Sequence, residues 1–302
     1  MNAAAFSPEG ARSLNAAKRP LPLVERLTPA AIGRAATLAL HDELALTPKP
    51  GLVTLVDNGS HDDMDAHTFM RSLFSLRGYF VRIAEAGHAG ADFAVLERCG
   101  IEAEARMLAA TRGINTHRGA IFMLGLLCAA AGAVSRECEC EGPLQPAQLR
   151  DVLRRHWGAA LLARSRRVST LPGGIAARRL GLRGASEEAA LGFPVLFETA
   201  VPALARGLAN GLTPQLARLD TLFHVMAVLD DSNLAHRGGL AGLRHAQDTA
   251  RNFIDGGGAA GEGALAQAQG IAEDFVARRL SPGGAADTLA AACWVMRICG
   301  VS

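Results

Sequence analysis

The sequence predicts an all-α protein, a single large domain in which long apolar helices form the core and polar loops form one cleft. Three observations favour this fold class. Apolar residues recur at helical spacing through most of the 302 residues. The alternating pattern of a strand is convincing only over 51–56. A chain of this length can also bury a substantial core.

The first two helices flank the most polar loop of the chain. A helix over 30–46 must end before Pro48 and Pro50, because proline fixes φ and disfavours the helical conformation in the residue before it. A second helix runs over 65–85, with Asp65 as its N-cap. Its apolar residues recur at steps of three and four and make one face: Phe69, Leu73, Leu76, Phe80 and Ile83.

The rest of the chain continues as helices separated by loops. Similar apolar patterns predict helices over 93–112, 117–134, 147–166, 186–208, 213–229, 265–280 and 284–299. Two segments rich in turn-forming residues, 137–148 and the glycine-rich 256–263, are expected to be flexible surface loops. Residues 1–27 are expected to be a flexible lead-in, so the folded domain spans 28–302.

The composition argues against several classes of protein. The formal net charge is only +2 and aromatic residues make up 5%, which does not suit a general nucleic-acid binder. The first 27 residues lack the apolar stretch of a signal peptide. The longest apolar run, 120–134, is about fifteen residues, short of the roughly 18 that cross a bilayer. We therefore expect a cytoplasmic protein that binds neither nucleic acid nor membrane.

The six cysteines do not form a disulfide framework in a chain of this size. Cys138 and Cys140 could supply half of a metal site, but no Cys-x-x-Cys pair accompanies them. Free thiols in a reducing cytoplasm are the favoured interpretation.

The loop between the first two helices concentrates charged residues. Lys49 lies between two prolines, and His61 is followed by the acids Asp62, Asp63 and Asp65. If the helix starts early enough, Asp62 and Asp65 share one face of its first turn. Hard oxygen ligands so close together suit Mg²⁺, whereas a helix cap would need only one of these acids. We favour a metal site.

A second polar cluster, 113–119, precedes the long apolar helix. Asn115 or Thr116 can cap that helix, whose first N–H groups then offer positive potential to an anion. Arg118 adds a bidentate fork for phosphate oxygens, although alone it would be an ordinary surface charge. The cluster therefore indicates an anion site.

Two more polar clusters lie towards the C-terminus. In 230–239, adjacent acids precede an Asn, a His, an Arg and two glycines at the end of an apolar helix, where a simple helix stop needs only the glycines. In 281–287, Ser281 as N-cap with Pro282 after it predicts a helix start. Capping explains the Ser and the Pro fully, but it leaves Asp287 unexplained.

Five motifs occur together and in order along the chain. They are Leu46-Thr-Pro-Lys-Pro-Gly-Leu-Val53, Gly59-Ser-His-Asp-Asp-Met-Asp65, Asn115-Thr-His-Arg-Gly-Ala-Ile-Phe122, Asp231-Ser-Asn-Leu-Ala-His-Arg-Gly-Gly239 and Ser281-Pro-Gly-Gly-Ala-Ala-Asp287. Over about residues 30–300 they resemble the triphosphoribosyl-dephospho-CoA synthase family. The segments 42–46 and 55–61 resemble the malonate decarboxylase branch more closely than the citrate lyase branch.

The resemblance implies a defined reaction. The 2′-hydroxyl of 3′-dephospho-CoA attacks C1 of the ATP ribose and expels adenine, so the triphosphoribosyl group is transferred intact. The product is the prosthetic-group precursor of the malonate decarboxylase acyl carrier subunit, which links this chain to that subunit and its prosthetic-group transferase. The resemblance also implies Mg²⁺ with ATP, and a homodimer is one assembly compatible with it.

Binding residues are carried over from the motifs. Three cations are expected to grip phosphates: Lys49, Arg118 and Arg237. Three acids are candidates for Mg²⁺ binding: Asp62, Asp65 and Asp231. Other candidates for substrate contact are Asn115, His117, Asn233, His236, Ser281, Gly283 and Gly284.

Acid–base chemistry is assigned to the remaining candidates. Departure of adenine calls for a general acid, and the attacking hydroxyl calls for a base; His61 or Asp63 would serve. The transition state resembles an oxocarbenium ion, which Glu43 or Glu104 could stabilise. Glu43 could also reach the Lys49 loop.

Two alternatives remain open. The pairs His41-Asp42 and His61-Asp62 are compatible with an all-α, metal-dependent nucleotide phosphohydrolase, which needs several His ligands around one metal. A non-catalytic module that binds dephospho-CoA or the acyl carrier subunit is the other alternative, but it would not need so many acids beside the basic groups.

Overall fold

The computed structural model describes residues 27–137 and 143–300 and confirms the all-α class. Within these ranges it has no strand. The α-helices are α1 (Pro29–Ala45), α2 (Ala66–His88), α3 (Phe93–Ala110), α4 (Arg118–Glu137), α5 (Pro146–Ser165), α6 (Pro172–Leu180), α7 (Ala185–Ala190), α8 (Val201–Ala209), α9 (Pro214–Met226), α10 (Ser232–Asp255), α11 (Ala264–Ala277) and α12 (Gly283–Cys299). A π-helical segment, η1 (Val195–Ala200), and a 3₁₀ turn, η2 (Gly258–Ala260), complete them.

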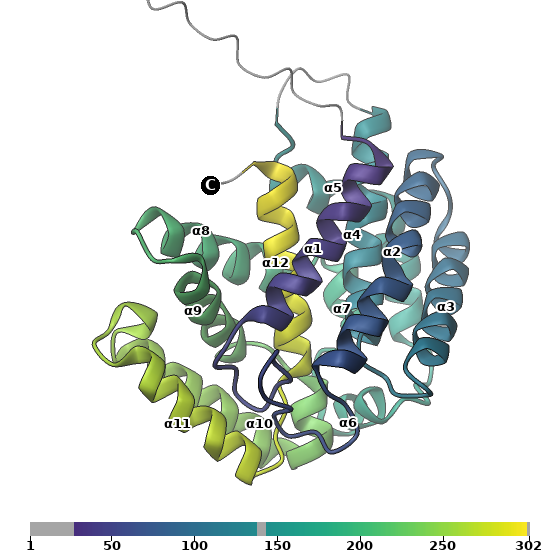
Figure 1. The fold of residues 1–302 in the computed structure, drawn as a ribbon. Coiled ribbons are helices and arrows are strands. Elements are labelled where there is room, and N and C mark those ends of the chain that lie inside the picture. Colours follow the sequence, from purple (N-terminus) through teal and green to yellow (C-terminus); the bar gives the residue numbers. More distant parts are fainter. Residues whose placement is uncertain (1–26, 138–142, 301–302) are drawn as a thin grey trace, which may run out of the picture.

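Four helices form the centre of the molecule: α1, α2, α4 and α12, which lie side by side in Figure 1. α4 is buried almost continuously from Ala120 to Val134. It is the one described helix that is long and apolar enough to cross a membrane, yet most of it is buried inside the protein. The apolar run therefore forms a core helix, as expected.

Glycines allow α2 and α4 to approach closely. A Cβ at Gly87 of α2 would overlap the carbonyl oxygen of Ala129, and a Cβ at Gly132 of α4 would overlap that of Ala84. Each helix thus packs its glycine against the backbone of the other. The apolar face predicted for 65–85 also forms, with Asp65 as the N-cap of α2.

The strand expected over 51–56 does not form. Gly51 has a φ of 63°, and the chain turns back on itself so that Thr54 N–H donates to the carbonyl of Asp57 at 2.7 Å. Leu55 and Val56 point to solvent, being 49% and 82% exposed. The alternation in the sequence therefore belongs to a compact turn.

Three helix assignments need correction. The helix expected over 186–208 is interrupted, because Gly192 and Phe193 have positive φ values of 78° and 50° before Pro194. α6 was not expected at all, since Pro172, Gly173 and Gly174 resemble a loop. α10 continues through the glycines of 238–239, with a kink at Gly239.

The glycine-rich segment 256–263 is more ordered than its composition suggests. It contains η2, where Ala259 N–H donates to the carboxylate of Asp220 on α9 at 2.9 Å. Cys99, Cys128, Cys293 and Cys299 are free thiols, as expected. Cys138, Cys140 and the lead-in up to residue 26 lie outside the described residues.

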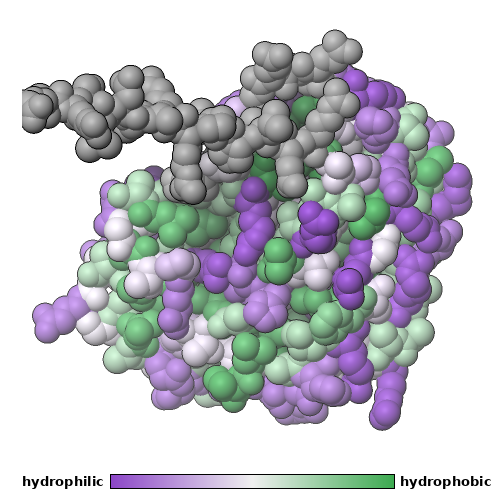
Figure 2. Space-filling model, turned by 45° about the horizontal axis from the view of Figure 1, so that its top comes forward, coloured by the Kyte–Doolittle hydropathy of each residue, from purple (hydrophilic) through white to green (hydrophobic). Residues whose placement is uncertain are grey.

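The polar loops gather at one end of the molecule. The C-terminal end of α12 lies at the top of Figure 1, whereas the starts of α2, α10 and α12 lie towards the bottom. Figure 2 brings the top forward, and outside the grey atoms hydrophilic and hydrophobic residues are interspersed there. The motifs of the sequence therefore meet at the bottom of the molecule as drawn in Figure 1, the end turned away in Figure 2.

Candidate active site

A cavity of about 1360 Å³ opens where the starts of α4, α10 and α12 meet the end of α1. All but three of the site residues expected from the sequence line it. They are Glu43, His61, Asp63, Glu104, Asn115, His117, Arg118, Asp231, Asn233, His236, Arg237, Ser281, Gly283 and Gly284. Motifs that are far apart in the sequence thus converge on one site.

Asp287, in the second turn of α12, is the carboxylate that had no role in the sequence analysis. It lines the cavity and accepts a hydrogen bond from the backbone N–H of Ala120, at the start of α4. Burial raises the pKa of Asp287 well above its ordinary value, and the charges of Glu43 and Asp231 raise that pKa further. The helix start expected to receive a substrate anion therefore already holds a carboxyl group of the protein.

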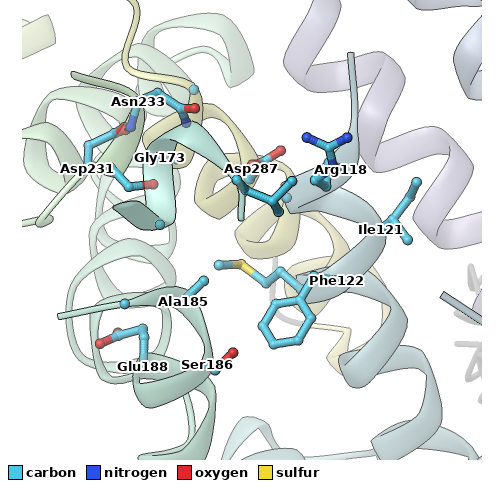
Figure 3. A pocket seen from close by; sticks show the side chains of 18 of the residues that line it. Arg118, Ile121, Phe122, Gly173, Ala185, Ser186, Glu188, Asp231, Asn233 and Asp287 are labelled. Carbon is cyan, nitrogen blue, oxygen red and sulfur yellow. The ribbon is translucent and has the colours of Figure 1, made fainter. Parts of the chain in front are cut away.

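Asp231 joins the starts of two helices. One carboxylate oxygen accepts from Asn233 N–H at 2.8 Å and caps α10, and the other accepts from Ala285 N–H of α12 at 3.0 Å. Burial raises the pKa of Asp231. The 230–239 cluster therefore begins a helix, whereas the sequence analysis placed it at a helix end. Figure 3 shows Asp231 and Asn233 on one side of the cavity and Arg118 of α4 on the other.

The Glu43–Lys49 pair forms as the sequence suggested, but it is fully enclosed. Lys49 Nζ lies 2.5 Å from Glu43 Oε1 and donates to the Glu43 carbonyl at 2.8 Å. Burial lowers the pKa of Lys49, and the charge of Glu43 opposes that shift. Lys49 does not line the cavity. In this structure its ammonium group supports Glu43 and does not face the space where a phosphate would bind.

His61 lies between two hydrogen-bonding partners that fix its tautomer. Arg237 Nη2, which can only donate, lies 3.1 Å from His61 Nδ1, so Nδ1 carries the lone pair. His61 Nε2 then carries the proton and donates to Ser281 Oγ at 3.0 Å. Burial, followed by the charge of Arg237, lowers the pKa of His61 to about 4. Ser281 therefore binds His61, and it is not the N-cap of α12 that the sequence predicted.

Arg237 holds the loop between α1 and α2 against the loop before α12. Its Nη1 donates to the carbonyls of Ser60 at 3.0 Å and Arg279 at 3.3 Å. Together with the bond to His61, these contacts occupy both terminal nitrogens. These contacts use three of the five guanidinium N–H groups, so the expected phosphate grip by Arg237 would have to use the other two.

The start of α4 supplies a further group of polar residues. Asn115 Oδ1 caps the helix by accepting from Arg118 N–H at 3.2 Å, and the Arg118 guanidinium lies 2.5 Å from Glu104 Oε1. His117 Nδ1 is 2.6 Å from Ser72 Oγ, while its Nε2 is buried without a hydrogen-bond partner among the described residues. Burial, followed by the charge of Lys49, lowers the pKa of His117 to about 3.

The acid triad proposed for Mg²⁺ is not assembled. Asp65 accepts from Thr68 N–H at 2.8 Å and caps α2, so it does not face the cavity. Asp62 precedes the helix and forms an exposed ion pair with Arg279. No three His, Cys, Asp or Glu side chains of the described residues are placed so that they could hold a metal ion. The carboxylates that do approach one another across the cavity are Glu43, Asp231 and Asp287.

One wall of the cavity was missed by the sequence analysis. It is formed by the segment from the end of α5 to α7, including Arg164, Arg167, Arg178 and Arg183. A signal was present, because 152–186 contains eight arginines and no acidic residue in a chain of net charge +2. Figure 3 shows Ser186 of this segment facing Phe122 of α4, and Gly173 beside Asp231.

Comparison with known proteins assigns the chain to a family. It matches the family model described as ATP:dephospho-CoA triphosphoribosyl transferase over residues 29–301. A "Probable 2-(5''-triphosphoribosyl)-3'-dephosphocoenzyme-A synthase" of Acinetobacter calcoaceticus is 36% identical over 264 residues, or 87% of this chain and 89% of that protein. A protein of the same name from Pseudomonas syringae pv. tomato is 37% identical over 293 residues, or 94% of each chain.

No solved structure matches the chain. The family match spans almost all of the described residues, and both relatives are covered over most of their length. The chain therefore belongs to the ATP:dephospho-CoA triphosphoribosyl transferase family.

Proposed function

We propose that this chain transfers the 5-triphosphoribosyl group of ATP to the 2′-hydroxyl of 3′-dephospho-CoA and releases adenine. Membership of the family and the names of both relatives support this activity. The cavity, at about 1360 Å³, exceeds the volume of roughly 300–1,000 Å³ typical of a site for one small ligand, so it has room for two nucleotides.

The observation that carries the proposal is the group of carboxyls Glu43, Asp231 and Asp287 beside the cavity. Attack at the anomeric carbon of a ribose passes through an oxocarbenium-like transition state, which nearby negative charge stabilises. Glu43 and Glu104, each ion-paired with a basic side chain, remain the candidates for that role.

Asp287 is the proposed acid. The reaction breaks the bond between ribose C1 and the adenine nitrogen and forms a bond from C1 to the 2′-oxygen. Adenine gains a proton from Asp287, and the hydroxyl proton passes to another carboxylate of the cavity lining. A carboxyl whose pKa is raised favours the protonated form, which can donate to the departing base. The sequence indicated His61 or Asp63 for this proton transfer, but His61 Nδ1 already accepts a hydrogen bond from Arg237.

Ser281 is proposed to orient a substrate oxygen. Its Oγ accepts the proton of His61 Nε2, so its own hydroxyl hydrogen is free to point elsewhere. Ser281 lines the cavity beside Gly283 and Gly284, where the backbone is accessible. His61 and Arg237 then act as positioning residues behind Ser281.

Mg²⁺ fits the site only if the substrate phosphates and water supply most of its ligands. The hard oxygens of Asp287 and Glu43 face the cavity, but no three acidic or His side chains among the described residues converge. Glu43 and Asp231 would hold the ion together with the triphosphate and water, while Asp287 keeps its proton for adenine. Bound there, the ion would neutralise phosphate charge and relieve the repulsion between these carboxyls.

The resemblance to the malonate decarboxylase branch suggests where the product is used. In this proposal the product serves as the prosthetic-group precursor for the acyl carrier subunit of malonate decarboxylase, and a prosthetic-group transferase consumes it. A cytoplasmic location and a homodimeric assembly belong to the same proposal.

The experiment that tests the proposed function is product analysis. The purified chain is incubated with ATP, Mg²⁺ and 3′-dephospho-CoA, and the products are separated by chromatography and identified by mass. Free adenine and an adduct that retains the triphosphoribosyl group are expected. Release of phosphate with adenine still on its ribose would instead indicate a phosphohydrolase, and unchanged substrates would indicate a binding module.

A further inference from the structure

Two arginines of the arginine-rich wall, Arg167 and Arg178, have no acidic partner of their own. Arg164 and Arg167 share one acid, Glu97, at 3.0 Å each. Arg178 donates to the carbonyl of Arg166 at 3.2 Å and has no acidic partner among the described residues. Arg183 is paired with Glu188 at 3.0 Å, and the charges of Glu187 and Asp230, which also line the cavity, act on it as well. The wall therefore presents unneutralised guanidinium groups to the cavity.

Other donors lie on the same wall. The hydroxyls of Ser169 and Thr170 and the backbone of Gly173 line the cavity between Arg167 and Arg178. Guanidinium groups, hydroxyls and backbone amides together are the set of donors that phosphate oxygens prefer. The wall is thus suited to an anionic group with several oxygens.

Another part of the cavity lining has the reverse character. Glu43, Asp231 and Asp287 gather there, and their mutual repulsion disfavours a bare phosphate. A triphosphate can approach these carboxyls only with a divalent cation. A phosphate group that carries no metal is therefore better placed at the arginine wall.

Apolar side chains at the mouth distinguish between the two substrates. Ile101, Val168 and Leu171 line the cavity and are 63%, 80% and 41% exposed. Val168 and Leu171 belong to the same segment as the arginines, and Ile101 of α3 lines the same cavity. Together they offer an apolar surface for an extended, weakly polar arm. Dephospho-CoA has such an arm, its pantetheine, attached to a diphosphate; ATP has none.

From these observations we propose that Arg167 and Arg178, together with Arg164 and Arg183, bind the diphosphate of 3′-dephospho-CoA. The pantetheine arm then lies against the apolar mouth, and the ribose 2′-hydroxyl points towards the carboxyl groups of the cavity. This assignment rests on the proposed function for the identity of the ligand. It adds the subsite and the orientation in which that ligand binds.

The test is the double variant R167A/R178A. Its affinity for 3′-dephospho-CoA, measured by calorimetric titration without ATP, is expected to fall at least about tenfold, because charge-assisted hydrogen bonds are lost. Affinity for Mg²⁺-ATP should stay within about twofold of wild type. The matched control is R154A/R179A, which removes the same charge from the same arginine-rich segment but from residues that do not line the cavity.

Each outcome decides the question. Weaker binding of Mg²⁺-ATP with unchanged binding of 3′-dephospho-CoA would overturn the assignment, because the wall would then hold the triphosphate. Equal affinities in R167A/R178A and R154A/R179A, or no binding of 3′-dephospho-CoA to the wild-type chain, would also overturn it. If R167A/R178A weakens 3′-dephospho-CoA binding but the wild-type chain releases no adenine, the subsite stands and the proposed function fails.

Discussion

Asp287 depends on a glycine for its place at the start of α4. The side chain of Asp287 reaches the N–H of Ala120, and a Cβ at Gly119 would overlap its carboxylate. Any side chain at residue 119 would therefore displace the carboxyl group that we propose as the acid. The glycine that follows Arg118 in this motif is therefore required for steric reasons, which the sequence alone does not show.

Replacing Gly119 by Ala is expected to lower the rate of adenine release at least about tenfold, because the displaced carboxyl no longer meets the departing base. Gly78→Ala in α2 is the matched control, since a Cβ there meets nothing within 4 Å. The measurement is kcat for both variants, with thermal unfolding as a check on folding. A wild-type kcat for Gly119→Ala would contradict the role of Asp287.

The buried Glu43–Lys49 pair is a second residue-scale feature with a measurable consequence. Both side chains are almost completely enclosed, so Lys49→Met leaves the Glu43 carboxylate buried without its partner. We expect the free energy of unfolding to fall by about 3–5 kcal/mol. Urea denaturation measures this value. The exposed pair Arg278–Asp274 gives the control, and a loss no larger than that of Arg278→Ala would show that the pair is unimportant.

At this scale the sequence predicted residue types better than roles. It identified Glu43 as a partner for the Lys49 loop and Asn115 as a possible cap, and the structure confirms both. It correctly predicted Asp65 as the cap of α2, but it did not show that this acid, named also as an Mg²⁺ candidate, lies outside the cavity lining. Such distinctions depend on the direction of a side chain, which spacing along the chain does not fix.

At the scale of elements, close packing of α2 and α4 positions the cavity. Gly132 packs on the carbonyl of Ala84, and Gly87 packs on the carbonyl of Ala129. The two contacts hold the helix that begins with the Arg118 motif against the one that follows the 46–65 loop. Gly87 and Gly132 therefore have a packing function.

Gly132→Ala is expected to destabilise the protein by about 1–3 kcal/mol, because the added methyl group must push backbone atoms apart. The same change at Gly270 of α11, where a Cβ meets nothing within 4 Å, should instead stabilise the helix by up to about 1 kcal/mol. Chemical denaturation of the two variants provides the comparison. If Gly132→Ala leaves the free energy of unfolding unchanged or raises it, as expected for Gly270→Ala, the close approach of the two helices is ruled out.

Helices with a continuous apolar stripe were predictable, and those without one were not. α1, α2, α4 and α12 were expected within a few residues of their observed bounds. α6 begins Pro-Gly-Gly, and α10 contains two adjacent glycines, so both lack the local propensity of a helix. Their helical state is stabilised by packing against the rest of the molecule.

At the scale of the whole molecule, folding keeps two cavity histidines neutral. The pKa of His117 is about 3 and that of His61 about 4, against an ordinary value of 6.5, in each case chiefly through burial. Below that ordinary value the unfolded chain binds protons that the folded chain does not. The free energy of unfolding therefore falls as the pH drops from 6.5 towards 4, and this contribution is complete above 6.5.

The variant His117→Gln isolates one of these histidines. Between about pH 7.5 and about pH 5, the wild-type chain should lose about 2 kcal/mol more stability than this variant. Urea denaturation at the two pH values measures the difference, and His41→Gln, at an exposed histidine, is the control. Identical losses in wild type and His117→Gln would mean that His117 is not held neutral by the fold.

The convergence of five motifs on one cavity was predictable only through their resemblance to a family. Periodicity indicated the helices, but it did not indicate that their starts meet at one end. The arginine wall was missed because its residues form no compact motif, although the absence of acids over 152–186 was visible. How segments distant in the sequence are placed around one cavity depends on the packing of the whole chain, and no single segment determines it.

The most direct test of the account is the stoichiometry of adenine and adduct in wild type and Asp287→Asn. Asn keeps the shape of the side chain and can still accept from Ala120 N–H, but it cannot supply a proton. Wild type is expected to form equal amounts of adenine and triphosphoribosyl adduct. In Asp287→Asn both should fall together by about 100-fold or more, with 3′-dephospho-CoA binding retained. A wild-type rate in Asp287→Asn, or adenine formed without adduct, would contradict the account.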